Sequence, residues 1–253
     1  MPATEPIIKI FADADYNRAV AIAVAELIIT RLATAGASSC SLSLSGGSTP
    51  GGVYKELALL DEAGGKQIQW QNVKLFLGDE RWVNETDPQS NARMVRETLL
   101  AAGSKVLPAK FFPPDTTLDC ATGAVRYADQ FVKELGPKAI FDVMLLGVGD
   151  DGHTVSIFPH SELLHSNPDL CAVARHPQNH STRITVSRTV LERARETVFL
   201  AKGSGKTDVI KRILNTDCAT IETEEIIPVL MFKSFTGQVR FLLDKSAAAG
   251  LTA

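Results

Sequence analysis

Short apolar runs with β-strand character alternate with longer segments of helical character along most of the 253-residue chain. The strand-like runs cover residues 7–12, 41–45, 73–80, 141–149, 183–187, 197–203 and 239–244. The run FDVMLLGVG at 141–149 is almost continuously apolar. This pattern is typical of a parallel strand that is covered by helices on both faces.

The segments between these runs predict helices, which we expect at residues 15–33, 51–63, 90–102 and 121–135. Ser90 or Asn91 is a suitable N-cap for the third of them. The alternation predicts an α/β fold with a doubly wound, mainly parallel, Rossmann-like sheet and helices on both faces. We expect one domain over residues 1–253, with a helical insertion near residues 102–137, where several prolines occur.

The charge balance limits the classes of partner. The chain carries 26 basic and 29 acidic residues and a formal net charge of −3. Proteins that bind nucleic acids or membrane surfaces normally carry a basic excess. We therefore expect no nucleic-acid and no membrane partner, and a small anionic ligand held by a few local cations.

The four cysteines, Cys40, Cys120, Cys171 and Cys218, lie far apart and form no CxxC pair. This spacing predicts reduced thiols rather than a disulfide framework or a zinc site. The first residues lack the pattern of a signal peptide, and no apolar run has membrane-spanning length. We expect a cytoplasmic protein, either a monomer or a small homo-oligomer.

The loop LSGGSTP is the first candidate for ligand binding, because loops after parallel strands meet at the edge where such folds bind ligands. Gly46 and Gly47 allow close approach of the backbone, and Ser48 and Thr49 offer hydroxyls. With Pro50 in the first turn of a helix, the free helix amides complete a typical phosphate site. An ordinary strand-to-helix turn is the alternative.

Two further loops place charges at the same edge. Asp79, Glu80 and Arg81 follow an apolar strand, although a solvated loop with a local ion pair would look the same. Lys206 lies in AKGSGKT, before a helix, and can bind a phosphate or carboxylate; the P-loop pattern fails because Leu200 replaces its first glycine. Arg183, at the start of RITVS, is the fourth candidate, with a surface arginine as the alternative.

The stretch GVGDDGH formally matches the G-x-G-x-x-G dinucleotide fingerprint. Asp150 and Asp151 would repel a pyrophosphate, and Asp169, at the required distance, does not end a strand. Asp151 and His153 are competent metal ligands, but their spacing matches no known ligand pattern. We therefore predict neither a cofactor nor a metal.

His153 remains as a candidate general base, because a neutral imidazole accepts protons near neutral pH. Asp151, or in its place Asp150, would orient the ring and stabilise the imidazolium. The alternative is a structural loop histidine bonded to a backbone carbonyl. The other histidines lack this setting and are interpreted as structural: His160, His165, His176 and His180.

Taken together, these motifs resemble the 6-phosphogluconolactonases and occur in the order found in that family. They are LSGGSTP (44–50), GDERWV (78–83) with SNARM (90–94), GVGDDGHTVSIFP (147–159), RITVS (183–187) and AKGSGK (201–206). Val155 departs from a common alanine and Asn84 from a usual proline. The resemblance implies a glucosamine-6-phosphate deaminase-like fold and hydrolysis of 6-phosphoglucono-δ-lactone without metal or cofactor.

The related glucosamine-6-phosphate deaminases are the main alternative, since they share the GSTP loop and the G-x-D-G-H element. Their typical run after the histidine places a catalytic glutamate where this chain has Phe158. An apolar ring cannot move protons in an aldose–ketose isomerisation, so Phe158 favours the lactonases. A non-catalytic module that senses sugar phosphates is a third interpretation, but it would not need His153.

The resemblance also implies roles for the candidate residues. The substrate phosphate would lie on residues 46–49, with Arg183 and Lys206 as cationic partners. His153 would activate water, with Asp151 orienting it. Arg81 or a loop amide would stabilise the oxyanion, and Asp79 would bind sugar hydroxyls.

Overall fold

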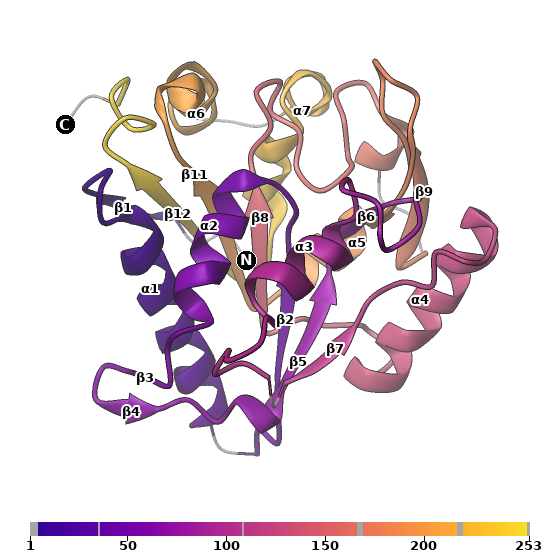
Figure 1. Cartoon of the computed structure of the whole chain (residues 1–253). Coiled ribbons are helices and arrows are strands. Elements are labelled where there is room, and N and C mark those ends of the chain that lie inside the picture. Colours follow the sequence, from indigo (N-terminus) through magenta and orange to yellow (C-terminus); the bar gives the residue numbers. More distant parts are fainter. Residues whose placement is uncertain (1–4, 35, 108, 166–168, 217–219, 252–253) are drawn as a thin grey trace.

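A parallel seven-stranded sheet forms the centre of the computed structural model, which describes residues 5–34, 36–107, 109–165, 169–216 and 220–251 (Figure 1). The strand order is β1-β12-β11-β8-β2-β5-β7. The strands are β1 (Ile7–Phe11), β2 (Cys40–Leu44), β5 (Val73–Leu77), β7 (Lys110–Phe112), β8 (Val143–Gly147), β11 (Glu196–Ala201) and β12 (Gln238–Asp244). All neighbours pair in parallel, as the sequence predicted.

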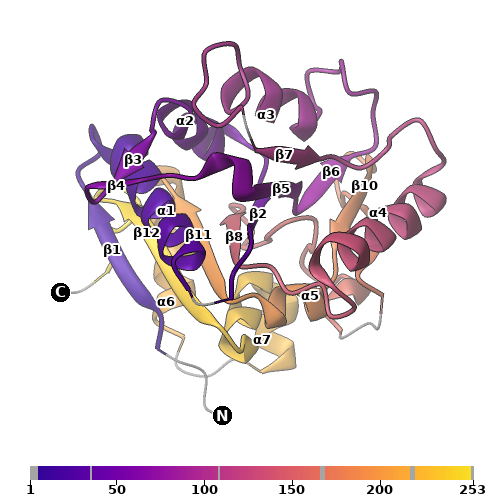
Figure 2. The ribbon, with the colours of Figure 1, turned by 90° about the horizontal axis from the view of Figure 1, so that it is seen from below.

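Helices cover both faces of this sheet (Figure 2). One face carries α1 (Tyr16–Leu32), α2 (Ser48–Leu57) and α3 (Asn91–Thr98). The other side holds α4 (Cys120–Leu135), α5 (Arg188–Arg193), α6 (Thr207–Leu214), α7 (Ile221–Ile226) and the 3-10 helix η4 (Pro228–Ser234). The doubly wound α/β prediction is therefore confirmed.

The central strand β8 shows why its sequence is apolar throughout. Val143 and Leu145 are buried in the core beneath α1 to α3, whereas Met144 and Leu146 are buried in the core on the opposite face. Each side chain is at most 1% exposed. Burial of such a side chain contributes about 1.5–3 kcal/mol, so both faces of β8 stabilise the fold.

A second, antiparallel sheet of three strands corrects part of the sequence prediction. It contains β6 (Asp79–Arg81), β10 (Thr182–Val186) and β9 (Cys171–Arg175), in that order. The run 183–187 was predicted for the main sheet, but it pairs with β6 and β9 instead. β9 and β10 are close in sequence and pair as a hairpin, as antiparallel strands can, whereas β6 joins β10 from a distant part of the chain.

Gly78 is the point at which the predicted strand 73–80 divides into β5 and β6. Its amide donates to Leu44 O at 2.8 Å, while its carbonyl accepts from Val186 N at 2.8 Å. A Cβ at this position would lie 3.1 Å from Val155 Cγ1 and 3.3 Å from Ser43 Oγ. Glycine thus lets the chain pass from the main sheet into the small one through a crowded space.

Residues 102–137, predicted as a helical insertion, contribute β7 to the main sheet and α4 to its cover. The Tyr127 hydroxyl of α4 accepts from Leu77 N at 2.7 Å and contacts the Leu77 and Phe112 carbonyl oxygens. The segment is thus part of the core packing. Its origin as an insertion, like the single-domain assignment, stays a prediction.

Several small elements complete the described part of the chain. They are the hairpin of β3 (Glu62–Ala63) and β4 (Lys66–Gln67) and the 3-10 helices η1 (Trp70–Asn72), η2 (Glu162–Leu164) and η3 (Ser204–Lys206). Within the described ranges, no helix combines the length and apolar character needed to cross a bilayer.

The buried carboxylate of Asp142 ties elements together at the amino end of β8, away from the loops that follow the strands. It accepts hydrogen bonds from Ser41 N and Oγ, both at 2.9 Å. Arg31 of α1 also donates to it, and Arg195 Nε lies 3.3 Å away. One side chain thereby connects β2, α1 and the segment before β11.

We expect Asp142→Ala to lower the free energy of unfolding by about 2–3 kcal/mol, because several charge-assisted hydrogen bonds lose their acceptor. Denaturant unfolding followed by circular dichroism measures this loss. The matched control is Asp61→Ala, which breaks an exposed ion pair with Lys105 at 3.5 Å. The control should change stability by less than about 0.5 kcal/mol; equal losses would contradict the assigned role.

Candidate active site

A cavity of about 170 Å³ lies at the carboxyl ends of β2 and β8. These strand ends form the upper edge of the sheet in Figure 1. Its wall consists of Ser45, Gly46, Gly47, Asp79, Arg81, Asn91, Gly147, Val148, Gly149, His153, Val155 and Arg183. The structure therefore brings together residues that the sequence placed in separate loops. The predicted members of the wall are Gly46, Gly47, Asp79, Arg81, His153 and Arg183.

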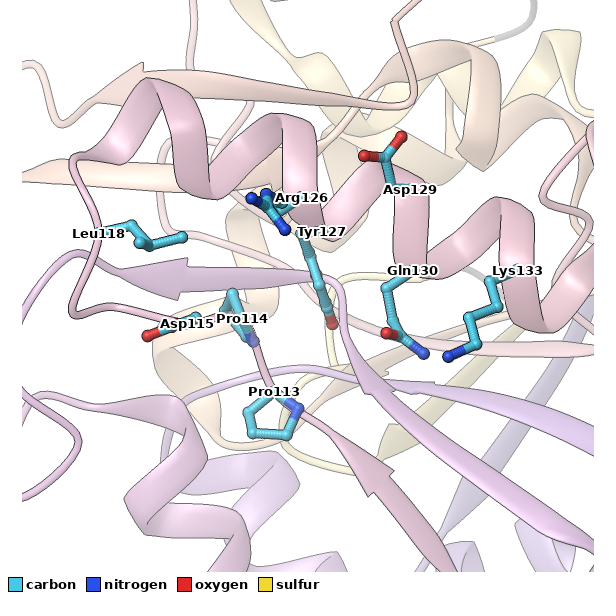
Figure 3. Close-up of a pocket in the computed structure, with 9 residues that line it drawn as sticks. All are labelled: Pro113, Pro114, Asp115, Leu118, Arg126, Tyr127, Asp129, Gln130 and Lys133. Carbon is cyan, nitrogen blue, oxygen red and sulfur yellow. The ribbon is translucent and has the colours of Figure 1, made fainter.

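A second cavity, of about 330 Å³, lies beside α4 and is larger than the first (Figure 3). Tyr127, Gln130 and Lys133 point from α4 toward the loop that contains Pro113 and Pro114. The Tyr127 hydroxyl is already bonded to backbone groups. None of the predicted site residues lines this cavity, so we assign the functional site to the smaller one.

His153 lies at the end of a tight loop, residues 148–153, which we call the histidine loop. The glycines of this loop leave space for the His153 side chain. Gly149 N donates to His153 O at 2.8 Å, and Gly152 N donates to Gly149 O at 3.0 Å. A Cβ at Gly149 would lie 2.1 Å from His153 Nδ1. Gly152 has φ of 82°, and a Cβ there would lie 2.7 Å from Ile227 Cγ2. These glycines therefore serve to position His153 and do not form a nucleotide-binding loop.

Asp151 is the carboxylate that orients His153. Its Oδ1 lies 2.5 Å from His153 Nδ1 and also accepts from the His153 backbone amide at 3.1 Å. Asp150, the alternative, is 84% exposed and pairs with Lys206 instead. With Nδ1 facing a carboxylate, the tautomer that donates from Nδ1 leaves Nε2 as the proton acceptor.

The pKa of Asp151 reflects this pairing. Burial raises the pKa of the carboxyl, but the hydrogen bonds from His153 and its charge outweigh burial and lower the pKa from 3.8 to about 2. The carboxylate is therefore ionised at neutral pH, where it stabilises an imidazolium.

Phe158 forms an apolar support for the imidazole. Its ring centroid lies 4.8 Å from that of His153 and 4.9 Å from that of His176. The guanidinium of Arg183 is 5.6 Å from the same ring, within cation–π distance. Phe158 is 3% exposed, so a buried ring occupies the position where the deaminase pattern has a glutamate.

Arg81 and Arg183 lie directly opposite each other in the β6–β10 ladder. The Nε atoms of both are buried and have no hydrogen-bond partner among the described residues. Arg81 donates from another guanidinium nitrogen to Gln89 O at 2.6 Å, and Arg183 lies 3.9 Å from Asp79 Oδ2. Burial lowers the pKa of Arg183, while Asp79 raises it. Two incompletely paired guanidiniums beside a cavity favour an anionic ligand.

Asp79 is fixed by a strained turn after the histidine loop. Val155 has φ of 47°, a left-handed conformation that is costly for a β-branched residue. Ile157 N donates to Thr154 O at 3.0 Å and closes this turn. The turn directs the Ser156 hydroxyl to Asp79 Oδ2 at 2.6 Å. Strain of this kind is typical of functional sites.

Glu80 points into the protein and is not a ligand-facing charge. Its carboxylate accepts from Asn91 N and Ala92 N, each at 2.7 Å, at the beginning of α3. Burial raises its pKa, the amide hydrogen bonds lower it, and Asp79 raises it further. The predicted N-cap Ser90 is confirmed, because its hydroxyl accepts from Arg93 N at 3.1 Å.

The GGST loop begins α2 as predicted, but it reaches the cavity only through its glycines. Gly47 is the N-cap with φ of 101°, and no side chain caps the helix. Ser48 is exposed, and neither Ser48 nor Thr49 is part of the cavity wall. The free amides at this helix start still offer donors to an anion.

Lys206 braces the histidine loop from outside the cavity wall. Its Nζ donates to Val148 O at 2.7 Å and pairs with Asp150 at 2.5 Å. Lys206 and Asp151 are thus adjacent to the cavity without being part of its wall. Within the described part of the chain, no group of three or more His, Cys, Asp or Glu side chains could hold a metal ion.

Asn91 is a wall residue that the sequence predicted only as a helix cap. Its Nδ2 donates to Asp79 O at 2.9 Å, and it is 1% exposed. The only signal in the sequence was its place in the SNARM motif, since a buried amide cannot be distinguished from a cap by residue type.

The parallel sheet and the cavity at its edge place this chain in the class of doubly wound α/β proteins. Within this class, the chain belongs to the family described as glucosamine-6-phosphate isomerases/6-phosphogluconolactonase, whose model matches residues 15–241. The resemblance predicted from the sequence motifs is therefore confirmed.

Three of the proteins that are similar to this chain share the name 6-phosphogluconolactonase. The chain is 31% identical over 206 residues to the 6-phosphogluconolactonase of Haemophilus influenzae, which covers 81% of this chain and 85% of the relative. The 6-phosphogluconolactonase structure from Shewanella baltica has a TM-score of 0.81 at 27% identity, covering 96% and 100% of the two chains. That from Leishmania guyanensis has a TM-score of 0.78 at 30% identity, covering 99% and 100%.

The lowered pKa of Asp151 predicts a pH-dependent stability. A carboxyl with a depressed pKa stabilises the fold fully above its unfolded value, near 3.8, and this contribution is lost as pH falls through about 2. The difference in unfolding free energy between wild type and Asp151→Asn should be largest at about pH 4–5 and should shrink in more acidic buffer. Denaturant titrations at a series of pH values measure it.

The same comparison in a His153→Ala background is the control, because the imidazole partner is then absent. Most of the pH dependence should disappear there. A difference in the wild-type background that does not change with pH would contradict the Asp151–His153 hydrogen bond.

Proposed function

We propose that this chain hydrolyses 6-phosphoglucono-δ-lactone to 6-phosphogluconate, a step of the oxidative pentose phosphate pathway, in the cytoplasm. Relatives in three organisms are named 6-phosphogluconolactonase. The observation that carries the proposal is the Asp151–His153 pair, with Phe158 packed against the imidazole, at a cavity that also contains two arginines. This arrangement suits hydrolysis of an ester that carries an anionic group.

His153 is the proposed general base. Its Nε2 takes a proton from water while the water oxygen attacks C1 of the lactone. Asp151, at 2.5 Å from Nδ1, stabilises the imidazolium that results. The C1–ring oxygen bond then breaks, and the imidazolium returns its proton to the ring oxygen. The product acid releases its own proton to solvent near neutral pH.

Arg81 is the proposed partner of the oxyanion that forms at C1. Its Nε is buried without a partner among the described residues, so it needs little reorganisation to donate. Asp79 is the proposed acceptor for sugar hydroxyls, since the Ser156 and Asn91 side chains hold its two carboxylate oxygens. Both roles follow from donors and acceptors that are oriented before the substrate binds.

The substrate phosphate is proposed to lie on the backbone of residues 46–49 at the start of α2. The uncapped helix amides supply donors there. Lys206 can exchange the exposed carboxylate of Asp150 for the phosphate, and Arg183 offers an unpaired Nε. Arginine and lysine at a helix start are a common combination for binding phosphate.

Lactone hydrolysis is favoured over deamination by one side chain. An isomerisation needs a second proton-transfer group next to the histidine, and Phe158 has none. Its ring instead packs on His153 and keeps water away from that side of the imidazole. A single histidine–aspartate pair is sufficient for the attack of water on an activated ester.

We expect His153→Ala to lower kcat by about 10²–10⁴-fold, the usual contribution of a general base. The measurement is hydrolysis of freshly prepared 6-phosphogluconolactone, corrected for its spontaneous opening. His165→Ala, at an exposed position, is the matched control and should retain wild-type kcat.

Near-normal kcat in His153→Ala would contradict the role of this histidine. Glucosamine 6-phosphate, assayed in parallel, should not be turned over. Its conversion by the wild type, without acceleration of lactone opening, would favour the deaminase interpretation.

We expect Lys206→Ala to raise KM for the phosphorylated lactone by about ten- to a hundredfold, the effect of losing a charged hydrogen bond. The kcat/KM for unphosphorylated gluconolactone should change little, because that substrate lacks the phosphate. Lys211→Ala, on an exposed position of α6, is the control. Equal losses on both substrates would show that Lys206 only braces the loop around Val148.

A further inference from the structure

Asn91 is a buried amide in the cavity wall, and only half of it is paired. Its Nδ2 donates to Asp79 O at 2.9 Å and lies 3.4 Å from Asp79 Oδ1. Both contacts are acceptors, so they assign the nitrogen and thereby the oxygen of the amide. Within the described residues, Oδ1 accepts no hydrogen bond from the protein, although the residue as a whole is 1% exposed. Oδ1 is not among the buried atoms that lack a partner, so this oxygen is open to the cavity that Asn91 lines.

The Asn91 oxygen lies beside the glycine loop that follows β2. A Cβ at Gly46 would lie 2.0 Å from Oδ1 and 2.6 Å from Cγ, so no residue except glycine fits there without moving the amide. Gly46 and Asn91 both line the cavity. The free oxygen is thus placed between the proposed phosphate loop and the Asp79 carboxylate.

The position of this amide is fixed before any ligand binds. Asn91 is the first residue of α3, and its backbone amide donates to the buried Glu80 carboxylate at 2.7 Å. Ala92 N and the Ser90 hydroxyl bind the same carboxylate at 2.7 and 3.2 Å. Since Nδ2 is committed to Asp79, rotation of the side chain would break a hydrogen bond. The amide can therefore act as a preorganised acceptor.

We propose that Asn91 Oδ1 accepts a hydrogen bond from one ring hydroxyl of the sugar lactone and so determines specificity for a hydroxylated substrate. The inference rests on the proposed lactone hydrolysis. Together with the Asp79 carboxylate, Oδ1 makes this part of the wall an acceptor surface, which is complementary to hydroxyl donors. A site built in this way rejects an analogue that lacks the hydroxyl, because the bound analogue would cover the oxygen without donating to it.

The test combines Asn91→Ala with a set of monodeoxy 6-phosphogluconolactones. Wild type should lose about ten- to a hundredfold in kcat/KM on one monodeoxy lactone, and Asn91→Ala should lose a similar factor on the parent lactone. On that monodeoxy lactone, the variant should lose little more, since the two changes remove the same hydrogen bond. Asn84→Ala is the matched control, because Asn84 is exposed in the same connection and lies outside the cavity wall.

Full multiplication of the two losses for every monodeoxy lactone would overturn the inference, whatever the stability of the variant. If Asn91→Ala does not fold, the wild type alone still supplies a test, because a wild type that loses less than about threefold in kcat/KM on every monodeoxy lactone lacks the proposed hydrogen bond. Failure of the wild type to accelerate opening of the parent lactone would instead overturn the proposed function. The two failures are therefore distinguishable in one set of assays.

Discussion

The pairing of β2 with β8 is the constraint on which the site depends. The two strands pair only at Leu42–Val143 and Ser43–Met144. The Asp142–Ser41 hydrogen bonds join their amino ends, and a 3.3 Å contact from Gly147 N to Ser45 Oγ joins the chain at their carboxyl ends. Successive strands add outward from β2 on one side and from β8 on the other. Doubly wound folds bind ligands at such a switch point, and here the glycine loop after β2 and the histidine loop after β8 both contribute to the cavity wall.

The electrostatic balance at the cavity depends on which carboxylates face the cavity and which face the protein interior. Glu80 holds the start of α3; in the described part of the chain it forms no ion pair with the arginines in the wall, and its charge only adds to the attraction that raises the pKa of Arg183. Asp79 compensates Arg183 only from 3.9 Å. Arg81 and Arg183 therefore retain positive charge and an unpaired Nε each at the cavity. Because desolvated like charges repel, this state favours an anion more strongly than an exposed pair of arginines would.

Much of this arrangement could be predicted from local sequence. Continuous apolar runs identified β8 and its parallel neighbours, and residue spacing was enough to suggest Asp151 and His153. The small sheet was not predictable, because β6 and β10 are short and pair across about a hundred residues. The inward direction of Glu80 and the half-paired amide of Asn91 also depend on tertiary contacts. A charged triplet or an asparagine at a helix start looks the same in sequence whether it faces solvent or a ligand.

Phe158 connects the fold to the proposed chemistry. Its ring contacts His153 on one side, His176 on another and the Arg183 guanidinium within 5.6 Å. An apolar surface there shields the imidazole from bulk water, and a low local dielectric strengthens the hydrogen bond to Asp151. A carboxylate in the same place would compete with Asp151 for the imidazolium and would neutralise Arg183. One apolar residue thus preserves both the single histidine–aspartate pair and the positive wall on which the proposed mechanism relies.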